Sequence, residues 1–519
     1  MEKIEIKKLR DLYNKFLNED YRLFNKKILA FNYLNLSILF SRDDREFDIN
    51  NFKLLKKLFN NQNVKKINPI SKPKKISGYY KYLFSLKESN YLPNKKLPII
   101  LMIDLLKFLK QIFDIFGIFL IIFFSILINN FNSKNSKNLI SNIKKVYSIY
   151  YWIKKKSESA TYYYPGIKKE ITNKVFISSF ADVKLNSIGL LSSIRDTKFL
   201  TPANFLNILD LKICIIQFIH LFLFDLYLLI FKRKLSFFYF WVGWKKASEI
   251  FYSILIYRSI IKLSKNYNQI EFVSWYENHI TNRAFSLAVS YSKKNKSSSS
   301  ILSTFNGALI TNNLPYYFLP SKLDNEIGLV GEKYYVQDES SKDEFKKYLK
   351  SEKIYIEVKK VPFSMVRTKT SLKDENSSKK FRNITIFTHA TYWDLLACIL
   401  SIFNERNKNC ALEQEIVKKE KLISIRLHPS LNKKVALEEI HQIKEIPNDI
   451  VYEFINNKKE NLITSLKSAN SCFFGISTYV NLAIELNKNV IAVETNHIYK
   501  PPIKRDLLNS PNIKFAIPW

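Results

Sequence analysis

The chain has 519 residues, and 82 lysines and arginines against 46 aspartates and glutamates give it a formal net charge of +36. At roughly 150 residues per domain this length predicts two to four domains, and a hydrophobic fraction of 47% excludes a largely disordered protein. Four scattered cysteines exclude a disulfide scaffold and a cysteine-based zinc ribbon, and the absence of GxGxxG and GxxxxGK argues against a dinucleotide-fingerprint enzyme and a P-loop NTPase.

The positive charge has two explanations that the total does not separate. Lysine, asparagine and isoleucine are abundant throughout, as an AT-rich genome would produce, whereas an anionic partner would also select basic residues. Basic residues flank the apolar stretches of the chain, which favours an anionic membrane surface as partner. Nucleic acid is not expected to be a partner, because no nucleic-acid-binding module is recognisable.

Residues 1–148 predict a helical N-terminal region with an apolar stretch at 98–128, and a second apolar helix is predicted at 205–231. Three interpretations stay open for these stretches: helices lying in the membrane interface, buried helices, and membrane-spanning helices. The first residues lack the apolar core of a secretory signal. We therefore expect a cytoplasmic protein, peripheral to the inner face of the cell membrane.

Strand and helix patterns alternate from residue 149 onward, which predicts parallel sheets and an α/β fold. Strands are expected at 174–180, 269–275 and 299–304, within a first lobe at 149–365. A polar linker at 366–380 precedes a second lobe at 381–519. Five strands with interleaved helices predict a doubly wound domain there, with the strands at 383–387, 422–426, 449–454, 472–474 and 489–493.

Polar residues follow the strands of the second lobe at positions where a parallel sheet binds ligands. We expect His389, Arg426 and His428 to contact a donor phosphate, because the following proline holds His428 at a strand tip. Ser477 and Thr478 begin a helix and are expected to bind the same anion. Each position also has a structural interpretation, as a turn histidine or as a helix cap.

The segment SWYENHITNRAF at 274–285 follows a strand of the first lobe. We expect Glu277 to be the catalytic base, with His279 also catalytic, and Asn278 and Arg283 to bind the acceptor. The alternative is a capping group for the helix that follows. No Asp-X-Asp or HExxH spacing occurs, so neither a metal nor another cofactor is expected.

These motifs resemble a known group of enzymes. RLHP around His428 and the later GxST at Ser477 and Thr478 resemble the His-Pro and Ser-Ser/Ser-Thr motifs of bacterial sialyltransferases and related GT-B transferases that use CMP- or CDP-activated donors. The WYEN segment is similar to that of bacterial surface-carbohydrate proteins associated with O-antigen and capsule assembly. The resemblance covers residues 270–500 and implies two Rossmann-like lobes, phosphate binding by His428, donor contacts by Ser477 and Thr478, and a base at Glu277.

The function expected from the residues and the resemblance together is a metal-independent glycosyltransferase. Its partners would be a nucleotide-sugar donor and a glycan or lipid-linked acceptor for surface polysaccharide. The alternative is a non-catalytic assembly protein that keeps the fold, because Asn306 stands where many such transferases carry a histidine in a Gln-His-Gly turn.

Overall fold

The computed structural model describes two groups of residues. The first comprises 97–131, 143–149, 173–177, 199–231, 247–266, 270–275, 280–295, 301–305, 328, 330–336, 339–348 and 355–358. The second comprises 381–518, apart from 390–391, 430, 442, 444–445, 458–459, 476, 478, 495–500, 502 and 505–506. Residues 1–96 of the predicted helical N-terminal region and the predicted linker at 366–380 lie outside the described residues.

The first lobe is built on a seven-stranded parallel sheet with the order β3-β2-β1-β4-β5-β6-β7. Its strands are β1 (Lys145–Ile149), β2 (Asn173–Ile177), β3 (Phe199–Leu200), β4 (Glu271–Trp275), β5 (Ile301–Phe305), β6 (Lys333–Val336) and β7 (Tyr355–Val358). The strands predicted at 174–180, 269–275 and 299–304 are confirmed as β2, β4 and β5. The sheet begins at Lys145, inside the region that the sequence assigned to the helical N-terminal part. The sequence did not indicate this strand because β1 is short and lies next to polar residues.

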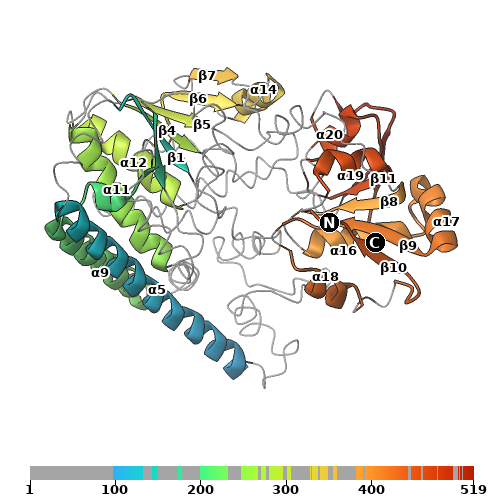
Figure 1. The fold of residues 1–519 in the computed structure, drawn as a ribbon, viewed down its shortest axis with the longest axis horizontal. Coiled ribbons are helices and arrows are strands. Elements are labelled where there is room, and N and C mark those ends of the chain that lie inside the picture. Colours follow the sequence, from blue (N-terminus) through green and yellow to red (C-terminus); the bar gives the residue numbers. More distant parts are fainter. Residues whose placement is uncertain are drawn as a thin grey trace.

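Most helices of the first lobe pack in successive layers on one side of the sheet, whereas α14 (Glu339–Tyr348) lies apart from these layers against β6 and β7 (Figure 1). The layered helices are α5 (Leu97–Phe131), η3 (Pro202–Asn204), α9 (Ile208–Phe231), α11 (Ala247–Asn266) and α12 (Ile280–Lys294). Helix α12 contacts β4 and β5, α11 packs along α12, and α5 and α9 both pack on α11. As a result α11 is buried along most of its length, and α5 and α9 form the outer layer.

One buried carboxylate ties the outer layer to α11. Asp210, in the first turn of α9, accepts hydrogen bonds from the Asn207 backbone and from the side chains of Arg258 (3.2 Å) and Lys262 of α11. Burial alone would raise the pKa of Asp210, but the hydrogen bonds and charges of Lys262, Asn207 and Arg258 together hold it below its ordinary value.

The second lobe contains a six-stranded parallel sheet with the order β10-β9-β8-β11-β12-β13. Its strands are β8 (Arg382–Phe387), β9 (Leu422–Arg426), β10 (Val451–Phe454), β11 (Ala469–Phe474), β12 (Asn489–Val493) and β13 (Ile513–Ala516). Numbered along the lobe, this order is 3-2-1-4-5-6, the order of a doubly wound sheet. The five predicted strands are confirmed, and β13 is a sixth.

Alternation along the central strands builds an apolar core on each face of this sheet. The covering helices are α16 (Tyr392–Phe403), α17 (Ala411–Glu420), α18 (Lys433–Ile440), α19 (Leu462–Ser468) and α20 (Tyr479–Glu485), with η5 (Lys408–Cys410) between α16 and α17. The first three pack with Ile384 and Ile386, whereas α19 and α20 pack with Phe387 and Phe474. The two sheets confirm the predicted fold class, an α/β protein with two Rossmann-like lobes (Figure 1).

Candidate functional site

The strand order places a switch point between β8 and β11 of the second lobe. The chain passes from β8 to β9 on one side of this point and from β11 to β12 on the other side. The carboxyl ends of β8 and β11 therefore border the crevice where doubly wound sheets bind ligands. Phe387 and Phe474, the last residues of these strands, stack with ring centroids 5.1 Å apart. His389 follows the first strand and Ser477 follows the second, so both lie at this edge of the sheet.

Two predicted donor-binding histidines meet at this edge. The ring centroids of His389 and His428 are 5.9 Å apart, and the planes are inclined by 35°. Thr388 positions both loops: its N–H donates to the Arg426 carbonyl (3.1 Å), and its Oγ1 accepts from the His428 backbone N–H (2.8 Å). The β8–β9 ladder thus continues one residue beyond the strands and places the two half-buried imidazoles side by side.

A carboxylate in the first turn of α16 holds the His389 loop. Oδ2 of Asp394 accepts the backbone N–H of His389 at 2.7 Å, and Asp394 is buried. A Cβ atom at Gly475 would lie 2.8 Å from Cγ of Asp394 and closer still to Oδ1. Only glycine therefore fits at 475 while Asp394 keeps this position. Neither role was predicted from the sequence, where the available signal was a glycine at a strand end in a chain with only nine glycines.

Ser477 lies at the same edge as the histidines but serves as a cap in the described structure. Its Oγ accepts the backbone N–H of Tyr479 at 3.4 Å, and its side chain is buried. The cap interpretation therefore has structural support. Thr478 lies outside the described residues, and anion binding by Ser477 stays a prediction.

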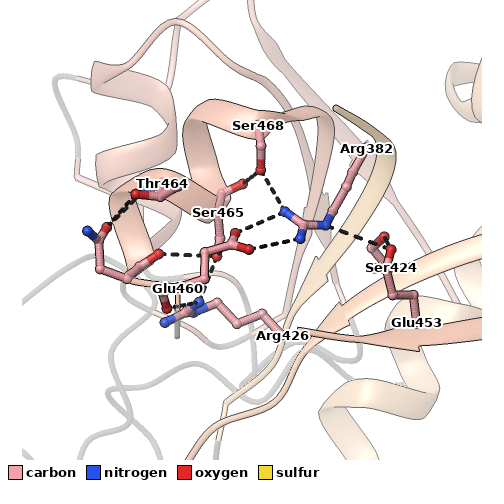
Figure 2. Close-up of polar contacts among 9 residues, drawn as sticks. Arg382, Ser424, Arg426, Glu453, Glu460, Thr464, Ser465 and Ser468 are labelled. Carbon is pink, nitrogen blue, oxygen red and sulfur yellow. Dashed lines mark hydrogen bonds and ion pairs between the residues drawn. The ribbon is translucent and has the colours of Figure 1, made fainter. Parts of the chain in front are cut away.

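Arg426 takes part in a polar network beneath this edge (Figure 2). Its Nη1 donates to the Glu460 carbonyl (3.0 Å) and to Oγ of Ser465 (2.6 Å). The Glu460 carboxylate in turn accepts two hydrogen bonds from Arg382, at 2.8 and 2.9 Å. Burial lowers the pKa of Arg426, and the Glu460 charge opposes that shift. These contacts anchor Arg426 to α19, and its donor contact stays a prediction.

The first lobe has a corresponding switch point between β1 and β4. Glu277, Asn278 and His279 follow β4 but lie outside the described residues. Arg283 is described: it lies in the first turn of α12 and is buried. Its neighbour Asn282 accepts a 2.9 Å hydrogen bond from Ser148 of β1, which fixes the start of α12 over the switch point.

Groups of three or more histidine, cysteine or acidic side chains that could hold a metal ion do not occur among the described residues. The edge presents the imidazoles of His389 and His428 side by side. Such groups bind and stabilise an anion by hydrogen bonding.

No model of a known protein family matches the chain, and no curated protein matches it. Among solved structures, a Listeria monocytogenes protein described as a UDP-N-acetylglucosamine 2-epimerase has a TM-score of 0.39 and 14% identity, covering 67% of this chain and 78% of its own.

Two other solved structures are similar at a lower level. The UDP-GlcNAc 2-epimerase from Neisseria meningitidis bound to UDP-GlcNAc has a TM-score of 0.36 and 13% identity, covering 72% of this chain and 86% of its own. The E. coli ADP-heptose lps heptosyltransferase II has a TM-score of 0.27 and 10% identity, covering 72% of this chain and 90% of its own.

Proposed function

We propose that the chain is a glycosyltransferase whose second lobe binds the phosphate of a nucleotide-sugar donor at the switch point between β8 and β11. The observation that carries this proposal is the pairing of His389 and His428, with ring centroids 5.9 Å apart at that edge. Two adjacent imidazoles repel each other when both are protonated, and an anion between them removes that cost. A phosphate at this position would accept a hydrogen bond from each ring.

The reaction needs an anion site because negative charge develops on the leaving nucleotide. The bond between the anomeric carbon and the phosphate oxygen breaks, and the nucleotide leaves with the electron pair. The acceptor hydroxyl forms the new bond to the anomeric carbon and gives its proton to a base, for which we propose Glu277. His389 and His428 would stabilise the departing phosphate, in a chain that has no Asp-X-Asp motif.

The acceptor belongs to the first lobe in this proposal. Glu277, Asn278, His279 and Arg283 follow β4 or begin α12, at the switch point of the other sheet. We propose a glycan or lipid-linked acceptor of surface-polysaccharide assembly and a donor that includes the CMP-linked sugars. Both rest on the motif resemblance, and the Asn282–Ser148 hydrogen bond supports a fixed helix start at that place.

Nucleotide binding tests the donor site directly. Titration calorimetry with CMP, UDP, GDP and ADP should find at least one ligand, and His389→Ala and His428→Ala should each weaken it about ten- to hundredfold, as expected for a lost charge-assisted hydrogen bond. His441→Ala is the matched control, because His441 is exposed at the end of α18 and should leave affinity unchanged. Equal affinities in all three variants would overturn the assignment of the site.

Turnover tests the reaction class. Incubating the bound nucleotide sugar with membrane glycolipid extract should transfer the sugar, and Glu277→Gln should abolish transfer while leaving nucleotide affinity nearly unchanged. Binding without consumption would instead support a non-catalytic assembly protein. Conversion of the sugar without any acceptor would replace transfer by isomerisation.

A further inference from the structure

The outer layer of the first lobe exposes apolar side chains along two helices. On α5 these are Leu106, Leu109, Phe113, Phe116, Phe124 and Ile128, which follow one another at helical spacings of three, four and eight residues. On α9 they are Leu209, Ile216, Ile219 and Leu223, again three, four or seven residues apart. We call these two stripes together the α5–α9 face.

Both stripes point away from the lobe because the opposite sides of the helices are occupied. Ile118, Ile122 and Ile126 of α5 are buried, and Gln111 accepts two hydrogen bonds from Ser248 at the start of α11, at 2.7 and 3.2 Å. On α9, Phe218 packs edge-on against Phe251 of α11, with ring centroids 5.4 Å apart. Figure 1 shows α5 and α9 side by side on the side of the lobe farthest from the sheet. Exposed apolar side chains gathered on two adjacent helices mark a surface for a membrane or a protein partner.

The charged residues around the α5–α9 face favour an anionic bilayer as its partner. Lys212 is exposed on α9, and the two cations Arg258 and Lys262 outnumber the one carboxylate of Asp210 that they pair with, so the described charges leave a positive excess beside the face. The acidic side chains that the structure describes there are neutralised: Asp114 lies 4.0 Å from Lys110, and Asp210 is buried with Arg258 and Lys262. An apolar stripe with basic residues and neutralised acids fits a bilayer with anionic headgroups, whereas a basic protein partner would meet like charge.

Helix α5 lies along the surface in this arrangement. The segment Leu109–Ile128 is long and apolar enough to cross a membrane, by length and composition. Its inner side, however, is packed on α11 and η3, and α11 carries the Arg258 and Lys262 pair of Asp210. Spanning would pull this ion cluster into hydrocarbon, which is costly for each charge. The exposed stripe runs along the helix axis, as it does in interfacial helices.

We propose that the α5–α9 face is a membrane-docking surface that inserts Phe113, Phe116 and Ile219 into the interface of an anionic bilayer. Docking is independent of the nucleotide site, so either proposal can fail while the other holds. If both hold, the bilayer supplies the acceptor, and the acceptor substrate of the proposed glycosyltransferase is carried on a lipid.

Vesicle flotation tests the proposal with the full chain. Wild-type protein should float with vesicles of phosphatidylcholine and phosphatidylglycerol, and less with phosphatidylcholine alone. The variant Phe113→Ser/Phe116→Ser/Ile219→Ser should reduce the bound fraction at least about tenfold. The control Phe381→Ser/Leu412→Ser/Val451→Ser changes side chains of similar exposure on the second lobe, 73% for Phe381 against 75% for Phe113, and should bind like wild type.

Three results would overturn the docking surface. One is equal flotation of the triple variant and its control. Another is a wild-type dimer in light scattering that the triple variant converts to monomer, because a second copy would then cover the face. The third is retention in membranes at high pH, which only a spanning helix would show. A circular-dichroism spectrum and a urea unfolding midpoint that match those of wild type will establish that the triple variant folds.

Discussion

The side chain of Asp394 packs directly against Gly475 at the switch point of the second lobe. The carboxylate of Asp394 occupies the position that a side chain at 475 would need, and from there it accepts the His389 backbone N–H at 2.7 Å. One end of β11 and the first turn of α16 therefore fix the loop that presents the histidine pair.

Gly475→Ala should lower the stability of the second lobe and weaken nucleotide binding. The added methyl group collides with Asp394, and overpacking of this kind typically costs about 1–3 kcal/mol. Asp394→Ala removes the obstacle, so Gly475→Ala should cost much less in that background, as a double-mutant cycle in urea would measure. In an Asp394→Asn background, where the shape is retained, the cost should persist. An identical cost in all three backgrounds would show that the two residues are not in contact.

Glu460→Gln should destabilise the second lobe strongly. It weakens the bidentate pair with Arg382, whose side chain is 8% exposed and cannot regain water. Breaking a buried pair from one side costs roughly 3–5 kcal/mol. Asp449→Asn is the control. Asp449 pairs with Lys421 at 2.6 Å, but both side chains are exposed, so the pair should contribute nothing measurable to the free energy of unfolding. Equal urea midpoints for the two variants would contradict the role of the network in Figure 2.

Asp210→Asn should destabilise the first lobe at neutral pH by roughly 1.5–3 kcal/mol, the contribution of hydrogen bonds to charged groups. Because the folded-state pKa of Asp210 lies below its ordinary value, the ionised carboxylate stabilises the fold at pH values above about 4. This contribution is lost as the pH falls through the lower folded pKa. The difference between wild type and variant should therefore shrink in strongly acidic solution, measured by urea unfolding at several pH values. A difference that does not change with pH would rule out an ionised Asp210 as its cause.

The cysteines should resist thiol reagents until the protein unfolds. All four are buried, and burial raises the pKa of Cys410 to about 11 and those of Cys214 and Cys472 to about 12, so the reactive thiolate is scarce. Labelling with a thiol-specific chromophore in increasing urea should follow unfolding. Cys214 reports the first lobe and the other three report the second, so mass spectrometry of labelled peptides distinguishes the lobes. Rapid labelling in native buffer would contradict this burial.

Much of the second lobe could be predicted because its strands are apolar runs followed by polar turns. The strand Leu422–Arg426 and the strand Asn489–Val493 match their predicted bounds, and the placement of His389 and His428 at one edge follows from parallel strands. In the first lobe β1, β3, β6 and β7 were not predicted, and β3 and β7 show why. They have two and four residues, too few for a period-two pattern to stand out, and pairing with β2 and β6 defines them.

The sequence by itself determined the α/β class, the two lobes and the residues that follow each strand, because alternation and turn chemistry are local properties. Tertiary structure alone decided which of those residues meet. The crossing of α16 over the end of β11 makes Gly475 necessary, and the approach of α19 to β9 engages Arg426 with Glu460 and Ser465. It also decided which sides of α5 and α9 stay exposed, because a helix that is apolar on every side does not reveal from its sequence which side its neighbours will cover.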